Sequence, residues 1–313
     1  MIDYDDGIYA IDTGFFRPNF DAAYLVVENG RAAFVDTGTN YAVPRLLDAL
    51  AEANLDVGDV DYVILTHVHL DHAGGAGAMM AKLPNARAVI HPRGAPHMID
   101  PSRLIAGATA VYGAEEMERS YGPLQPIDAS CVDVAEDNHT VDLAGRPLLC
   151  IDAPGHARHH LVVHDAKSRA FFTGDTFGLS YREFDTERGP YILPTTSPVQ
   201  FEPAALHASI DRMLGFDPQQ MFLTHFGRIA DVRRCAADLH GQIDRMVEIA
   251  REHAHAEDRH DRIKDALGSL YVGRTMAHGC TLPSAEVREL LAMDIELNAQ
   301  GLEVWLDKTS KTS

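Results

Sequence analysis

The run His67-Val68-His69-Leu70-Asp71-His72 concentrates four side chains that bind metal ions. It follows the apolar stretch 62–66, which is predicted to be a strand buried on both faces. In extended backbone, residues i and i+2 point the same way, so His67 and His69 can bind one ion. Neutral imidazoles and carboxylates are ligands for zinc, iron, manganese and nickel. Because four such groups cannot easily surround a single ion, the run favours two adjacent ions.

Three further polar motifs follow predicted strands. Pro154-Gly155-His156 comes after strand 148–151, Gly174-Asp175-Thr176 after strand 170–173, and Thr224-His225-Phe226-Gly227 at the end of strand 221–224. In α/β folds, ligand-binding groups collect at strand ends. The sequence therefore predicts that His156, Asp175 and His225 complete the coordination of the two ions.

The order of these four motifs resembles the metallo-β-lactamase superfamily, over about residues 5–230. The resemblance implies an α/β fold, a four-layer αβ/βα sandwich with the site along one edge of two packed sheets. It implies two divalent metal ions, zinc in first place and iron or manganese as alternatives. It also implies which residues bind them: His67, His69 and His156 one ion, Asp71, His72 and His225 the other, and Asp175 both, together with a water or hydroxide.

Within that superfamily, the motifs at 155–156 and 174–176 and the helical C-terminal part are most similar to the glyoxalase II (hydroxyacylglutathione hydrolase)-like branch. The resemblance implies hydrolysis of a thioester or a related ester or lactone by a bridging hydroxide, with Asp71 as the catalytic residue that orients the hydroxide or passes on its proton. Two features depart from that branch. Residue 68 is a valine within the first motif, and no segment matches the branch's basic glutathione-contacting residues.

Two other classes of function remain open. Persulfide dioxygenases of the same superfamily use a single iron and would make the protein an oxidoreductase. A non-catalytic metal-binding member of the fold is the second alternative.

A lactonase would use a loop tyrosine near the carbonyl, and Tyr181 and Tyr191, in the predicted loop after Asp175, are the candidates for substrate binding.

Other histidines offer a contrast. His160 follows His156 closely and is predicted to support a metal ligand rather than bind the metal. His253 and His255 repeat the His-x-His spacing, but they lie in a helical-looking polar segment where i and i+2 do not face each other. We expect this second pair to be solvated.

The elements that must position these residues change in character along the chain. Up to about residue 230, predicted strands alternate with helices, which is typical of an α/β sandwich. The strands are expected at 7–13, 22–27, 32–35, 62–66, 86–91, 148–151, 161–164, 170–173 and 221–224, with a hairpin turn at Asn29-Gly30 and helices at 41–54 and 201–214. Three further helices are expected at 231–253, 256–270 and 284–306. The predicted domains are a catalytic domain at 1–230 and a helical C-terminal region at 231–313.

Composition bounds the partners. The 313 residues include 27 Lys and Arg against 46 Asp and Glu, a net charge of −19. This sign argues against nucleic acid and against anionic membrane surfaces. A small-molecule acyl substrate is what the resemblance to the glyoxalase II-like branch implies. The four cysteines form no C-x-x-C pair and are expected to be reduced, and the acidic N-terminus lacks the features of a secretory signal. We therefore expect a cytoplasmic enzyme, and homo-oligomer formation stays open.

Overall fold

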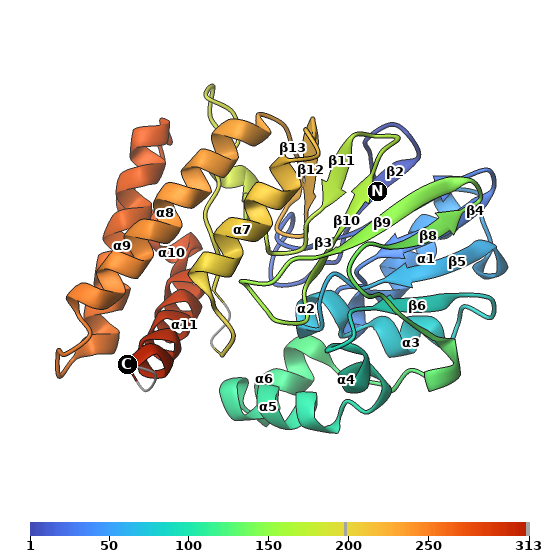
Figure 1. Cartoon of the computed structure of the whole chain (residues 1–313), viewed down its shortest axis with the longest axis horizontal. Helices are drawn as coiled ribbons and strands as arrows, with labels where there is room; N and C mark the ends of the chain where they lie inside the picture. Colours follow the sequence, from blue (N-terminus) through green and yellow to red (C-terminus); the bar gives the residue numbers. More distant parts are fainter. Residues whose placement is uncertain (197–198, 311–313) are drawn as a thin grey trace. The chain divides into compact units, whose positions relative to one another are not determined.

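The computed structural model describes residues 1–196 and 199–310, and within them the strands form two sheets (Figure 1). The first sheet has seven strands in the order in which they follow along the chain. They are β1 (Ile2–Asp3), β2 (Ile8–Asp12), β3 (Ala22–Glu28), β4 (Arg31–Val35), β5 (Val60–Ile64), β6 (Arg87–Ile90) and β7 (Val132–Val134). The turn between β3 and β4 is the predicted Asn29-Gly30 hairpin, in which both residues have positive φ.

The second sheet has six strands in the described residues, in the order β13-β12-β11-β10-β9-β8. They are β8 (His139–Leu143), β9 (Arg146–Asp152), β10 (Leu161–Asp165), β11 (Ala170–Phe172), β12 (Gln220–Leu223) and β13 (Gly227–Ile229). Tyr24 and Val26 of the first sheet share a buried core with Phe172 and Phe222 of the second. The two sheets therefore pack face to face.

Alternation along β3 shows why the first sheet is buried on both faces. Ala23 and Leu25, between the residues that face the second sheet, belong to another core together with Leu46 and Met79. Helices supply that core: α1 (Val43–Glu52), α3 (Ala76–Met80) and α4 (Ala95–Ile99). The short α2 (Leu70–Ala73), α5 (Ser102–Tyr112) and α6 (Ala114–Glu116) complete the helices of this part of the chain.

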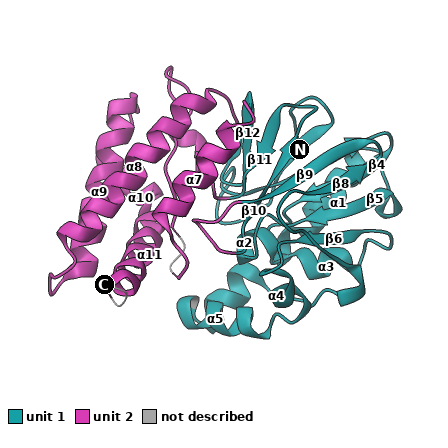
Figure 2. Ribbon diagram, in the orientation of Figure 1, with its two compact units in different colours: residues 1–152, 159–174, 218–228 teal, residues 153–158, 175–217, 229–313 magenta. Residues whose placement is uncertain are grey.

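Five α-helices follow β11 in the described residues: α7 (Pro203–Leu214), α8 (Val232–Glu252), α9 (Arg259–His278), α10 (Ser284–Leu290) and α11 (Ala292–Ser310). Two compact units can be distinguished (Figure 2). One comprises residues 1–152, 159–174 and 218–228, and the other residues 153–158, 175–217 and 229–313. The second unit takes in residues 153–158 and 175–217 in addition to the C-terminal helices. The division into domains at 1–230 and 231–313 stays a prediction.

The predicted mixed α/β sandwich of two sheets with C-terminal helices is confirmed. Two of the C-terminal helices differ from prediction. The helix expected at 256–270 runs on to His278 and ends at Gly279, whose φ of 101° suits a glycine cap. The helix expected at 284–306 is interrupted at Leu291, where ψ is 11° and the backbone leaves helical geometry. Among the described residues, no helix combines the length and apolar composition that crossing a bilayer requires.

Candidate metal centre

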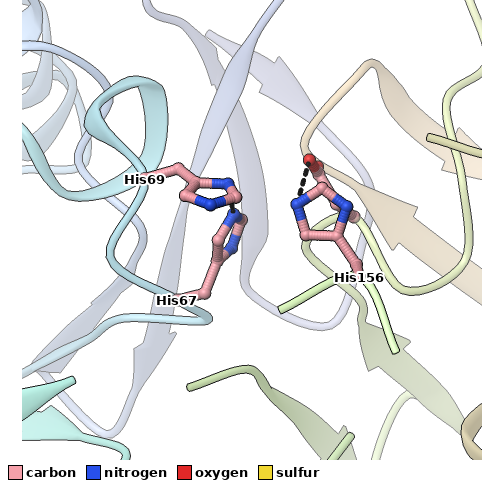
Figure 3. Close-up of side chains that lie close together, drawn as sticks. His67, His69 and His156 are labelled. Carbon is pink, nitrogen blue, oxygen red and sulfur yellow. Dashed lines mark hydrogen bonds and ion pairs between the residues drawn. The ribbon is translucent and has the colours of Figure 1, made fainter. Parts of the chain in front are cut away.

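The first histidine motif begins in the segment after strand β5 and ends within helix α2. Residues 65–69 are outside regular secondary structure, and α2 begins at Leu70, directly after His69. The extended backbone of His69 (φ −67°, ψ 152°) brings two imidazoles together. Nε2 of His67 and Nδ1 of His69 lie 2.8 Å apart (Figure 3). Two ring nitrogens aimed at each other in this way can share a proton or bind one cation.

A buried carboxylate, Asp36, organises the second half of the motif. Its Oδ2 lies 2.9 Å from Nδ1 of His72 and 3.2 Å from Oγ1 of Thr224. Its Oδ1 accepts hydrogen bonds from the backbone N–H and the hydroxyl of Thr66, at 2.8 and 3.0 Å. Because a carboxylate can only accept, the Nδ1 of His72 carries the proton, and its Nε2 presents a lone pair.

The hydroxyl of Thr66 links Asp36 to His67 through two hydrogen bonds. It donates to Asp36 and lies 3.2 Å from Nδ1 of His67. Since the hydroxyl proton is used toward Asp36, the hydroxyl oxygen accepts from Nδ1, and Nε2 of His67 is left with its lone pair. The ring of His67 also stacks on that of His160, with centroids 4.6 Å apart and an interplanar angle of 20°.

Backbone carbonyls hold the two distant histidines in the same way. Nδ1 of His225 lies 2.9 Å from the carbonyl oxygen of Phe20, and Nδ1 of His156 lies 3.3 Å from that of Thr195. A carbonyl only accepts, so each Nδ1 donates and each Nε2 offers a lone pair. These Nε2 atoms face carboxylates: His225 lies 3.4 Å from Oδ2 of Asp71, and His156 lies 3.4 Å from Oδ2 of Asp175.

Two glycines allow this geometry. Gly155 has a φ of 133°, and a Cβ there would lie 2.3 Å from the backbone of Leu206 in α7. Gly174 has a φ of 47°, and a Cβ there would lie 2.6 Å from Nε2 of His160. Any larger residue would push away the segments that carry His156 and Asp175, which explains glycine at these strand ends.

The candidate ligands fall into two groups, and within each group one ligand atom per residue lies within 4.8 Å of the others. The members of the first group are His67, His69, His156 and Asp175, and those of the second are Asp71, His72 and His225. The donor set fits a transition metal or zinc, because four of its imidazoles, those of His67, His72, His156 and His225, have a partner at Nδ1 that leaves Nε2 for a metal, and carboxylates accompany them. His253 and His255 belong to neither group.

A further buried acid lies beside the second group. Asp21 is fully buried, and burial raises the pKa of its carboxyl to about 7, although interactions with His225 and His72 act to lower it. Its Oδ2 accepts a hydrogen bond from the hydroxyl of Thr13 at 2.6 Å.

Sequence reasoning missed Asp36. This residue directly follows β4, at the start of Asp36-Thr37-Gly38, so the rule that polar groups collect at strand ends could have identified it. It is 1% exposed and has a φ of 58°, a left-handed conformation that Asp adopts more readily than most residues.

The predicted supporting and substrate-binding residues have different surroundings. His160 is fully buried and contacts His67, as a residue that positions a ligand should. Tyr181 and Tyr191 are also buried, and their hydroxyls lie 3.1 Å from Oδ1 of Asp294 and 3.3 Å from Oε1 of Gln242. These contacts bind the loop to helices α11 and α8, and a role of the two tyrosines in substrate binding stays a prediction.

Comparison with known proteins gives a consistent picture. The family model described as the metallo-β-lactamase superfamily matches residues 17–225. A metallo-β-lactamase fold-containing protein of Sulfurisphaera tokodaii is 25% identical over 72% of this chain and 80% of its own length. A crystal structure of an archaeal superfamily protein from Sulfolobus tokodaii superposes with a TM-score of 0.65 at 22% identity, covering 95% of this chain and 98% of that one.

Relatives whose names state an activity match a smaller share of the chain. A hydroxyacylglutathione hydrolase of Acidiphilium cryptum is 27% identical over 64% of this chain, and an acyl-coenzyme A thioesterase of Bos taurus is 24% identical over 54% of it. The matched regions span 62% and 63% of the lengths of these two enzymes, which is less than two thirds.

Proposed function

Because this chain belongs to the metallo-β-lactamase superfamily, we propose that it is a metal-dependent hydrolase of thioesters or related esters and lactones. The observation that carries the proposal is the pair of ligand groups, each gathered within 4.8 Å. The hydroxyacylglutathione hydrolase and thioesterase relatives favour a thioester over the other substrates.

In this proposal the two groups bind two divalent ions, zinc in first place with iron or manganese as alternatives. Nε2 of His67, Nδ1 of His69 and Nε2 of His156 would bind one ion. Thr66 and the carbonyl of Thr195 occupy the Nδ1 atoms of His67 and His156, and Nδ1 of His69 faces Nε2 of His67 at 2.8 Å, where an ion would replace a shared proton. Asp71, together with Nε2 of His72 and of His225, would bind the other. Asp175 would serve both ions.

When bound, such a pair of ions polarises a carbonyl and lowers the pKa of a bound water toward neutrality. The chain's own residues would orient the attacking water and accept its proton. The side chain of Asp71 is 25% exposed, more than those of His72 and His225, and its Oδ2 lies between them, at 3.8 and 3.4 Å from their Nε2 atoms. A carboxylate in this position can orient the attacking water and accept its proton, which makes Asp71 the proposed catalytic residue.

Residues around the ligands keep this arrangement rigid. Asp36 and the carbonyl of Phe20 hold the rings of His72 and His225, and His160 packs against the ring of His67. Preorganised groups lose little free energy to rearrangement during the reaction.

A cytoplasmic location is part of the proposal, and the four free cysteines are consistent with a reducing compartment.

The test combines metal analysis with a substrate screen. The purified protein is assayed for zinc, iron and manganese and then for thiol release from acyl thioesters, with lactones and phosphodiesters in parallel. We expect two ions per chain and thioester hydrolysis that a chelator abolishes and zinc restores. His69→Ala should lose metal and activity, whereas His255→Ala, which changes the other His-x-His pair, should retain both.

Two results would overturn the proposal. One iron per chain, with oxygen consumption in the presence of glutathione persulfide, would identify a mononuclear oxidoreductase. Full hydrolysis by the His69→Ala preparation would show that the measured activity does not come from this site, and a metal-loaded wild type with no activity of its own would be a non-catalytic metal-binding protein.

A further inference from the structure

An aromatic cluster lies on the loop between β2 and β3. We define it as Phe15, Phe16 and Phe20 of this loop together with Tyr121, which ends the helical turn Met117–Tyr121. The ring centroid of Phe15 lies 4.6 Å from that of Phe16, 5.9 Å from that of Phe20 and 5.5 Å from that of Tyr121. Spacings in this range are those of packed aromatic pairs.

The inner end of the aromatic cluster contacts the candidate metal centre. Phe20 accepts the hydrogen bond from Nδ1 of His225 through its carbonyl, and its ring lies edge-on to the imidazole at 5.4 Å between centroids. Phe16 follows outward, 5.5 Å from Phe20. The apolar rings therefore lead from a proposed metal ligand toward solvent.

The outer end of the aromatic cluster is exposed at a cost in stability. Phe16 is 57% exposed, and its φ of 56° places a bulky residue in the left-handed region. Neither feature helps the chain to fold, because the strain opposes folding and the ring remains in water. Strained, exposed apolar residues of this kind concentrate at binding sites.

The loop is nevertheless fixed. Asp12 accepts hydrogen bonds from the backbone N–H of Gly14 at 2.9 Å and from that of Asn19 at 3.0 Å, one with each carboxylate oxygen. Asp12 thus closes the loop around Phe16. A surface that is already ordered before binding loses less entropy when a ligand contacts it.

We propose that the aromatic cluster binds the acyl part of the substrate and that this part is an apolar chain, not the small hydroxyacyl group of hydroxyacylglutathione. The inference rests on the proposed hydrolase function and names the substrate class of the same site. With the acyl carbon at the metal centre, a hydrocarbon chain would run along this loop to the exposed ring of Phe16. The ring of Phe20 is buried beneath it, with the guanidinium of Arg17 4.9 Å from its centroid. Binding of the hydrocarbon chain would remove apolar surface from water on both partners, which is the main source of affinity for such a ligand.

The test compares acetyl, butyryl and octanoyl thioesters of one thiol in the wild type and in Phe16→Asn. Asparagine tolerates the left-handed conformation, so this variant removes the ring without straining the loop. In the wild type, kcat/KM should rise about tenfold from acetyl to octanoyl, and Phe16→Asn should remove most of that rise. Phe216→Ala, which removes another partly exposed ring at 40% exposure, should keep the wild-type ratio.

Two measurements that need no turnover accompany the kinetics. The S-octyl thioether of the same thiol cannot be hydrolysed, and calorimetry should show about tenfold weaker binding to Phe16→Asn than to the wild type. The Tm of Phe16→Asn should stay close to that of the wild type, because the relief of backbone strain offsets the loss of the ring contacts with Phe15 and Phe20. A clear fall in Tm would identify Phe16 as a packing residue and overturn the inference.

The outcomes separate this inference from the proposed function. If all three thioesters are hydrolysed and Phe16→Asn leaves the octanoyl-to-acetyl ratio of kcat/KM unchanged, the acyl-chain inference is overturned. The proposed hydrolase function is not affected by that result. No turnover of any thioester, with thioether binding that depends on Phe16, would overturn the proposed function and support the binding of an apolar chain by the aromatic cluster.

Discussion

Replacement of Asp36 by asparagine should weaken metal binding by the group of Asp71, His72 and His225 while the protein stays folded. In the wild type, Oδ1 of Asp36 accepts from the backbone N–H of Thr66 at 2.8 Å, and Oδ2 faces Nδ1 of His72 at 2.9 Å. A backbone N–H can only donate, so the amide oxygen of the variant must stay beside Thr66. The amide nitrogen then takes the place of Oδ2 and donates to Nδ1 of His72. The imidazole proton moves to Nε2, the atom proposed to bind the metal.

The size of the effect follows from this change of tautomer. Loss of a carboxylate that orients a metal-binding histidine costs about 10–100-fold in metal affinity. The amide oxygen keeps the hydrogen bonds from Thr66, but the amide nitrogen cannot accept from the hydroxyl of Thr224 as Oδ2 does. The cost in stability is the loss of this bond and the replacement of charge-assisted bonds by neutral ones, about 1–3 kcal/mol. A protein of ordinary stability tolerates a loss of this size.

The assay is zinc titration in competition with a chromophoric chelator, with metal content measured after dialysis and urea denaturation measured in parallel. Asp152→Asn is the matched control, because Oδ1 of Asp152 faces Nε2 of His91 at 3.0 Å and His91 belongs to neither ligand group. We expect Asp36→Asn to bind one ion with wild-type affinity and the second about 10–100-fold more weakly, and the control to bind both normally. Wild-type affinity for two ions in folded Asp36→Asn would refute the reasoning.

Three further predictions concern other residues. Asp175→Ala removes the carboxylate proposed to serve both ions, so metal content should fall below one ion per chain; two ions and normal turnover would contradict this assignment. Asp165 is buried, which by itself raises its pKa, but hydrogen bonds from Arg146 and Ser168 lower it overall. The buried pair of Asp165 and Arg146 therefore stabilises the fold fully at pH values above 3.8, the ordinary pKa of an aspartate. This stabilisation is lost as the pH falls below that value. Asp165→Asn should lower the free energy of unfolding by about 3–5 kcal/mol at pH 7, measured by urea denaturation. If the difference in unfolding free energy from the wild type does not become smaller near pH 3, the assigned role of this pair is wrong. Tyr181→Phe should change kcat/KM by no more than about twofold, because its hydroxyl contacts Asp294; a loss of about 100-fold would instead favour the predicted role of Tyr181 in substrate binding.

The strands were predictable because buried strands leave apolar runs between turn residues. The stretch 62–66 overlaps β5 (Val60–Ile64), and Asn29-Gly30 forms the expected hairpin turn. The candidate ligands were predictable because histidine and aspartate at successive strand ends are an unusual combination. Their gathering into two groups agrees with that expectation, although their roles as ligands stay a proposal.

Features that depend on contacts between distant parts of the chain were not predictable. Asp36 acts through Thr66 and Thr224, and a single Asp-Thr-Gly segment looks like an ordinary turn. The surroundings of Tyr191 are decided by Gln242, 51 positions away in the sequence. The interruption at Leu291 has no local signal, since the surrounding residues favour helix and tertiary packing overrides their propensity.

The central claim is that two metal ions are bound by side chains from four strand ends. Anomalous diffraction at the zinc absorption edge, from crystals of the zinc-loaded protein, tests it most directly. The account predicts two peaks, one among His67, His69 and His156 and one among Asp71, His72 and His225, with Asp175 beside both. A single peak, or two peaks away from these side chains, would contradict it.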